Sequence, residues 1–95
     1  MKLVIRDIAR ADLRDIYRYS AQRFGKNKAK HYTKEIEQRI YQIRDNPKLG
    51  KNLDYVKPNL RSVLALKHSI YYRIQPTQLI ILRVLHQSRD AGRHL

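Results

Sequence analysis

The sequence predicts an α+β fold in which an N-terminal strand and an antiparallel helical hairpin pack on an antiparallel sheet. Apolar residues follow the helical period between Ala9 and Asp45, and a period close to two after Pro58. The connections between these segments are short, which favours antiparallel neighbours. A chain of 95 residues, 42% of them hydrophobic, has room for one core, so we expect a single domain over residues 1–95.

Two helices are expected, at residues 9–24 and 28–45. Gly25 is typical of a helix end, Asn27 can cap the second helix, and Asn46-Pro47 stops it. A gap of about three residues between the helices favours an antiparallel hairpin. The expected apolar stripes consist of Leu13, Ile16, Tyr17, Ser20 and Phe24 in the first helix, and of Ala29, Tyr32, Ile36, Ile40 and Ile43 in the second.

The strands are expected at residues 2–6, 61–67, 69–74 and 79–86. Residues 47–60 are rich in turn formers and predict a surface loop, whereas Gln87–Leu95 is expected to be a polar, mobile tail. If the helices cover the face carrying Ile70, Tyr72 and Ile74, then Arg73 points away from them, and strand alternation puts Leu79, Ile81, Arg83 and Leu85 together on one face. A basic open sheet face is a plausible surface for an anion, and solvated arginines explain it equally well.

The charge is strongly positive, because 21 Lys and Arg stand against 8 Asp and Glu and leave a net +13. Such a surface attracts nucleic acid, an anionic membrane or an acidic protein, and composition does not choose among them. The chain has no cysteine, which suits a reducing cytoplasm. Residues 1–8 are too short an apolar run for a signal peptide or a membrane span, so we expect a soluble cytoplasmic protein.

Little in the chain points to a catalytic or metal centre. The four histidines are scattered without partners at ligand spacing, so we expect no metal and no cofactor. The glycines are isolated and no nucleophile elbow occurs, which leaves phosphate loops and hydrolytic triads unsupported. RNA cleavage stays open, because His and Arg can supply the acid, the base and the charge that it needs. The candidates for that chemistry are Arg61, Arg73, Arg83 and His86.

Four groups of residues together resemble the ParE branch of the RelE/ParE toxin superfamily. Each group alone is weak, but they occur in the family's order and span nearly the whole chain. They are Ala9-x-Ala11-Asp12-Leu13-x-Asp15-Ile16, then Asn46-Pro47-x-Leu49-Gly50, then Leu60-Arg61-Ser62 with Lys67-His68-x-Ile70-x-Tyr72-Arg73, and finally Val84-Leu85-His86-Gln87 with Arg89-Asp90 and a closing Arg93-His94-Leu95.

The resemblance implies a RelE-like fold and the toxin of a type II toxin–antitoxin system. It also implies a ParD-like antitoxin whose acidic, flexible C-terminal segment wraps the toxin in a hetero-oligomeric complex. ParE-type toxins are thought to poison DNA gyrase, whereas RelE-type toxins cut messenger RNA on the ribosome. This chain has no tyrosine after Tyr72, and Lys51 and Lys57 match the RelE loop lysines only loosely. We therefore favour gyrase poisoning by binding, without catalysis, and keep a RelE-like endoribonuclease as the alternative.

Two interaction surfaces are expected. A hairpin in so short a chain is only partly covered, and its apolar and basic residues suit an acidic antitoxin segment. The candidates there are Leu13, Tyr17, Lys28, Tyr32, Ile36 and Arg39. The target is expected to bind the last strand and the tail through Arg83, His86, Gln87, Arg89, Asp90 and Arg93.

Overall fold

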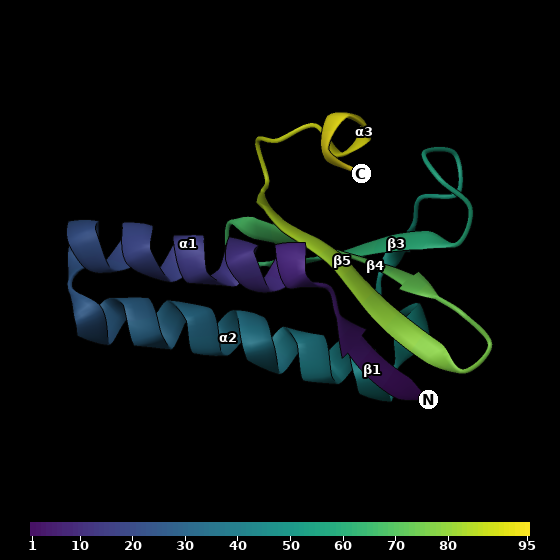
Figure 1. The fold of residues 1–95 in the computed structure, drawn as a ribbon, viewed down its shortest axis with the longest axis horizontal. Coiled ribbons are helices and arrows are strands. Elements are labelled where there is room, and N and C mark those ends of the chain that lie inside the picture. Colours follow the sequence, from purple (N-terminus) through teal and green to yellow (C-terminus); the bar gives the residue numbers. More distant parts are fainter.

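The predicted α+β arrangement is confirmed in a computed structural model that describes residues 1–95. After the first strand, β1 (Lys2–Ile5), two long helices lie side by side, α1 (Asp7–Phe24) and α2 (Lys26–Asp45) (Figure 1). The remaining elements are the 3-10 turn η1 (Pro47–Leu49), the strands β2 (Lys51–Asn52), β3 (Leu60–Ala65), β4 (His68–Ile74) and β5 (Gln78–His86), and the short helix α3 (Ala91–His94).

The strands form one five-stranded sheet in the order β1-β5-β4-β3-β2. Strands β3 to β5 pair antiparallel, as predicted. The two-residue β2, inside the segment predicted to be a loop, also pairs antiparallel with β3. The expectation of a wholly antiparallel sheet is wrong at one edge, because β1 runs parallel to β5 with Leu3 opposite Leu79. The whole helical hairpin lies between β1 and the rest of the sheet in sequence, and so long a connection permits parallel pairing where a tight turn would not.

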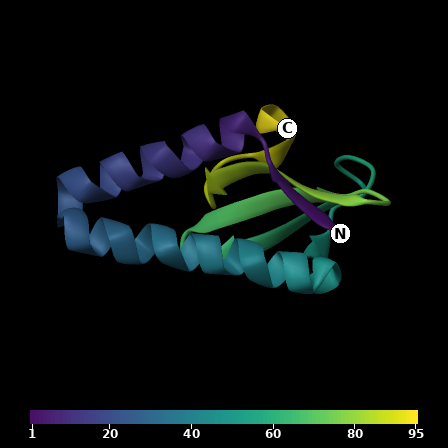
Figure 2. The same cartoon turned by 60° about the horizontal axis from the view of Figure 1, so that its bottom comes forward.

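The hairpin covers one face of the sheet and makes the main core with it (Figure 2). As predicted, Ile70 and Tyr72 face the helices and are completely buried. The far end of the hairpin reaches well beyond the sheet, so the turn between α1 and α2 has no strand beneath it (Figure 1). The helical residues of the main core are Ala9, Ile16, Ile36, Ile40 and Ile43.

The turn between the helices is tighter than expected. Gly25 alone separates α1 from α2, and its positive φ of 90° reverses the chain in one residue. Asn27 therefore lies inside α2 and is not its cap, and no side chain caps this helix. The hairpin itself is confirmed.

A β-bulge changes which residues of β5 face the helices. Tyr71 pairs with Arg83 and Tyr72 with Ile81, which leaves Leu82 as the extra residue. Leu82 and Leu85 consequently lie on the open face, while Val84 joins the main core. The prediction that Leu85 shares a face with Leu79 and Ile81 is wrong, because one inserted residue reverses the alternation.

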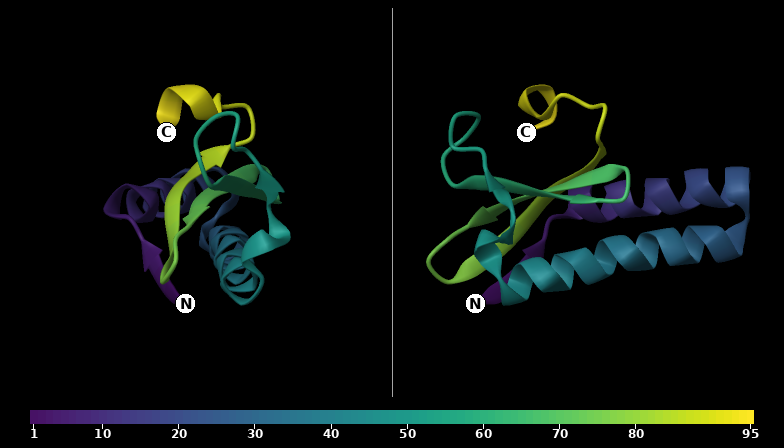
Figure 3. Two further views of the ribbon diagram at one scale, coloured as in Figure 1. Left: turned by 90° about the vertical axis from the view of Figure 1, so that its right-hand side faces the viewer. Right: turned by 180° about the vertical axis from the view of Figure 1, so that it is seen from behind.

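The open face of the sheet carries a second apolar cluster, where a basic surface was expected. Its buried residues are Leu53, Leu60, Tyr71, Leu82 and Leu85, and partly buried Ala91 and Leu95 pack against them. The predicted mobile tail is thus folded back at residues 91–95, because these two apolar side chains cover the second cluster. Figure 3 shows α3 beside the loop that joins β2 to β3, and the Lys57 ammonium donates a hydrogen bond to the Leu95 carbonyl there.

The end of α2 is fixed by a tyrosine on the sheet. The Tyr72 hydroxyl donates to the Pro47 carbonyl at 2.6 Å and accepts from the Gly50 amide at 2.9 Å. A Cβ at Gly50 would lie 2.6 Å from that hydroxyl and 2.7 Å from the Ser62 carbonyl oxygen. The Asn46-Pro47-x-Leu49-Gly50 segment therefore has a structural role.

Candidate functional site

Strand β5 extends past the end of β1, and a carboxylate from α1 binds the edge that is left without a neighbouring strand. Asp12 accepts two hydrogen bonds from the Arg83 guanidinium, at 2.8 Å from Nε and 2.9 Å from Nη2. The same carboxylate accepts the Val84 amide at 3.0 Å, which satisfies a backbone donor that β1 does not reach. The two side chains keep only 16% and 13% of their surface, so this is a well-covered bidentate ion pair.

Arg83 is therefore a structural residue and not a free cation of the target surface. Its hydrogen bonds to Asp12 raise the pKa of the guanidinium above its ordinary value, so the group stays charged. Its remaining nitrogen, Nη1, donates to the His94 carbonyl at 3.3 Å. Arg83 thus ties α1, β5 and α3 together at one corner of the molecule.

Three rings follow one another at the same end of the sheet, and we call Tyr32, His68 and His86 the ring cluster. Their rings meet edge to face, with centroids 5.5 Å apart for Tyr32 and His68 and 5.4 Å apart for His68 and His86. The Tyr32 hydroxyl accepts the Lys67 amide at 3.2 Å and shares a hydrogen bond of 2.7 Å with His68 Nδ1. The cluster leads from the partly buried α2 side to an exposed imidazole.

Burial keeps the inner histidine uncharged. Burial, together with the neighbouring His86 and against the opposing effect of Asp12, lowers the pKa of His68 to about 4. Burial also raises the pKa of the Tyr32 hydroxyl. The outer ring, His86, accepts the Ser88 amide at Nδ1 at 3.1 Å. A neutral, half-buried imidazole thus lies beside an exposed one.

The chain that follows β5 presents polar side chains to solvent. His86, Gln87 and Arg89 are exposed, and the backbone here is held by the Gln87 amide, which donates to the Lys67 carbonyl at 2.8 Å. Asp90 accepts the Gly92 amide at 2.9 Å and so caps α3. Arg93 is exposed, with its Nε 4.0 Å from Asp90. This surface is therefore polar, accessible and anchored to the sheet.

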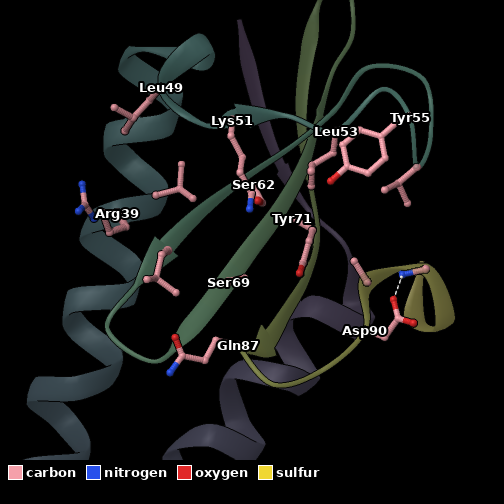
Figure 4. A pocket seen from close by; sticks show the side chains of 15 residues that line it. Arg39, Leu49, Lys51, Leu53, Tyr55, Ser62, Ser69, Tyr71, Gln87 and Asp90 are labelled. Atoms are coloured by element: carbon pink, nitrogen blue, oxygen red, sulfur yellow. Dashed lines mark hydrogen bonds between the residues drawn. The ribbon is translucent and has the colours of Figure 1, made fainter.

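A groove of about 760 Å³ runs over the open face of the sheet (Figure 4). Leu53 and Tyr55 flank it on the side of the β2–β3 loop, Arg39 flanks it on the α2 side, and Gln87 and Asp90 lie toward the C-terminal segment. Its floor carries the hydroxyls of Ser62, Ser69 and Tyr71. No three His, Asp or Glu side chains converge here or elsewhere to hold a metal ion. None of the helices has the length and apolar character needed to cross a membrane.

Comparison with known proteins gives the family. The model of the ParE toxin of the type II toxin–antitoxin system parDE matches residues 3–91. The chain belongs to the ParE toxin family. It is 37% identical over 87 residues to Toxin ParE1 of Caulobacter vibrioides, and the aligned region covers 92% of this chain and 90% of that protein. Toxin ParE1 of Mycobacterium tuberculosis is 33% identical over 88 residues, with the same shares covered.

A solved structure agrees with the fold. The chromosomal ParDE TA system from P. aeruginosa contains a chain that superposes with a TM-score of 0.80 at 23% sequence identity. The match covers 90% of this chain and 95% of that one. The α+β fold of this ParE-family chain is thus shared with a solved ParDE structure.

The residues suggested for a nuclease do not converge. Arg61 and Arg73 lie at one end of the sheet, near Leu60, while His86 lies opposite His68 at the other end. Arg73 is five residue steps along β4 from His68, which corresponds to roughly 17 Å. Arg61 donates to the Gly50 carbonyl at 2.7 Å, and Arg83 is held by Asp12. Arg61, Arg73, Arg83 and His86 therefore do not converge on one point of the sheet.

The residues suggested for the antitoxin surface fall into two groups. Lys28 and Arg39 are exposed, whereas Leu13, Tyr17 and Tyr32 are partly buried and keep accessible surface. Ile36 is 0% exposed inside the main core, so its inclusion in a partner surface is wrong. Its helical spacing could not separate a core position from a partner-facing one.

Asp12 and His68 are the residues whose roles sequence reasoning missed. Both belong to segments that carry the family resemblance, but their partners lie far away in the chain. Asp12 bonds to Arg83 across 71 residues, and His68 bonds to Tyr32 across 36. The only local signal was a carboxylate on the first helix near its apolar stripe.

Proposed function

We propose that this ParE-family toxin acts in the cytoplasm by binding DNA gyrase, and that a ParD-like antitoxin neutralises it in a hetero-oligomeric complex. The observation that carries the proposal is the exposed surface of His86, Gln87, Arg89 and Arg93 after β5. The hydrophobic core does not need these side chains. The surface is held in place by Arg83 below it and by Asp90, which caps α3.

Binding fits this surface better than catalysis does. The cations suggested for a nuclease are spread over both ends of the sheet, and two of them hold the fold together. Acid–base catalysis requires groups within hydrogen-bond reach of one reacting atom. Recognition of a protein surface requires only accessible side chains in a fixed arrangement.

The test is a gyrase supercoiling assay with single variants Gln87→Ala, Arg89→Ala and Arg93→Ala. A binding surface loses about 1–3 kcal/mol for each important contact, so we expect potency to fall roughly 5- to 150-fold per variant. The control is Lys48→Ala, an exposed cation outside this surface, which should keep full potency. Unchanged supercoiling in the presence of active toxin would rule out gyrase as the target.

The antitoxin proposal rests on charge and on the uncovered hairpin. A toxin of net charge +13 attracts an acidic chain, and a flexible acidic segment orders itself on contact. We place it along the hairpin at Leu13, Tyr17, Lys28, Tyr32 and Arg39. The solved ParDE relative supports an antitoxin partner of this kind. Removing the acidic C-terminal segment of the antitoxin should abolish most of its affinity, and full neutralisation by the truncated form would contradict the placement.

A second candidate function is ribosome-dependent cleavage of messenger RNA, favoured by the ring cluster alone. His68 is neutral and hydrogen-bonded to the Tyr32 hydroxyl, and exposed His86 lies against it. Positioned proton transfer contributes roughly 10²–10⁴-fold, so His86→Ala would remove nearly all cleavage by such a site. Codon-specific cleavage that depends on His86, together with unaffected supercoiling, would favour the nuclease over gyrase binding.

A further inference from the structure

The hairpin carries two rows of cations that no part of the fold uses. Each row has three exposed residues spaced four apart, which places them on one side of their helix about 6 Å from one another. We call these six residues the basic face: Arg10, Arg14 and Arg18 of α1, and Lys26, Lys30 and Lys34 of α2.

Both rows lie on the side of the hairpin turned away from the sheet. In α1 the contact with the sheet is made by Asp12, and in α2 by Tyr32. Arg10 lies two positions before Asp12 and Arg14 two positions after it. Each arginine therefore points roughly 160° away from Asp12 around the helix axis. Lys30 and Lys34 stand in the same relation to Tyr32. The two rows therefore share the outer surface of the hairpin, on helices whose axes lie roughly 8–10 Å apart. Because Gly25 alone joins the antiparallel helices, the rows are staggered: Lys26 lies at the turn and Arg10 at the opposite end.

Almost nothing neutralises this charge. Arg18 has one acidic partner, Asp15, at 3.7 Å, and that ion pair is largely exposed to solvent and therefore weak. The other five cations make no ion pair. Like charges four residues apart on a helix repel one another by a few tenths of a kcal/mol per pair. An anion bound across both rows would remove that repulsion.

The density of charge indicates which anion fits. The two staggered rows together span roughly 21 Å of the hairpin axis, over which duplex DNA carries about twelve phosphates, about six on each strand. An extended acidic peptide points only alternate side chains to one side, so it offers about three carboxylates over the same length. The six cations therefore exceed what the peptide can neutralise, whereas a duplex offers enough phosphates to pair with all of them.

We infer that the basic face binds the phosphate backbone of duplex DNA. The inference is independent of the gyrase proposal, because it concerns the toxin and DNA alone. DNA held on the outer surface of the hairpin leaves the surface after β5 free, since the two lie on different elements. A toxin bound to DNA in this way remains able to use Gln87, Arg89 and Arg93 for a protein target.

The test measures binding of full-length toxin, freed of antitoxin, to a fluorescein-labelled 20-base-pair DNA duplex by anisotropy between 50 and 200 mM salt. Six neutralised phosphates give a slope of log K against log salt of about −5, and an affinity loss of about 10³-fold over this range. The variant carries Arg14→Gln, Arg18→Gln, Lys30→Gln and Lys34→Gln. The matched control loses the same charge elsewhere, through Lys2→Gln, Arg6→Gln, Lys48→Gln and Lys51→Gln.

The expected result is a slope flatter by about 3.6 in the hairpin variant, with affinity at 50 mM salt reduced far more than in the control. Glutamine keeps helix propensity, and circular dichroism verifies the fold of both variants. Equal losses in the two variants would overturn the inference, because the binding would then follow net charge alone. Unchanged DNA affinity with a loss of antitoxin affinity would also overturn it, and would assign the face to the antitoxin.

Discussion

Replacing Asp12 tests whether the last strand is held by a buried ion pair. Asp12→Ala removes the carboxylate that accepts both Arg83 nitrogens and the Val84 amide. The Arg83 side chain, 16% exposed, would keep its charge with no acidic partner. The amide on the edge of β5 would also lose its acceptor.

The magnitude follows from what each change leaves behind. Breaking a well-covered pair by removing one partner costs about 3–5 kcal/mol, and Asp12→Ala should reach the upper part of that range. Asp12→Asn keeps an acceptor for Val84 and should cost about 2 kcal/mol. Arg83→Met in the Asp12→Ala background removes the stranded charge, so the double variant should be about 2 kcal/mol more stable than the sum of the single changes predicts.

The measurement is urea unfolding of the parent and the four variants (Asp12→Ala, Asp12→Asn, Arg83→Met and the double variant), compared at a common slope with denaturant. Toxicity should follow the fraction folded, because Arg83 acts through the fold. Lys48→Met serves as a control for the loss of one exposed cation. The reasoning is refuted if Arg83→Met abolishes toxicity while the free energy of unfolding changes by less than about 0.5 kcal/mol, the range of ordinary surface substitutions.

Two further predictions concern the hydrogen bonds that the Tyr72 hydroxyl makes with Pro47 and Gly50, and the ring cluster. Tyr72→Phe should lower the free energy of unfolding by about 2–4 kcal/mol, because Gly50 and Pro47 lose their partners, while Tyr41→Phe at an exposed site should change it little. The depressed pKa of His68 means that the unfolded chain takes up a proton first as pH falls below about 6.5, so stability should decline between there and pH 4. The ring is half-buried and screened by solvent, so we expect about 1 kcal/mol by pH 5. His68→Gln should flatten this decline and exposed His31→Gln should not. A Tyr72→Phe protein as stable as the parent, or an unaltered pH profile in His68→Gln, would contradict these assignments.

The sequence by itself determined the type and order of the main elements. The apolar stripes of residues 9–45 can be buried only as helices, and alternation in residues 69–74 correctly placed Ile70 and Tyr72 against them. These patterns are local, because each follows from the geometry of one helix or one strand. The ordered family motifs also determined the family, since they span nearly the whole chain.

The tertiary structure alone decided which polar residues serve the fold and which remain free. The bulge beside Tyr71 adds one residue to β5, and one residue reverses every later side chain, so Leu82 and Leu85 made the open face apolar. Arg83 became structural because α1 brings Asp12 to it from 71 residues away. Local spacing carries no record of such a partner, since the pairing exists only once the helix, the strand and the edge between them have been assembled.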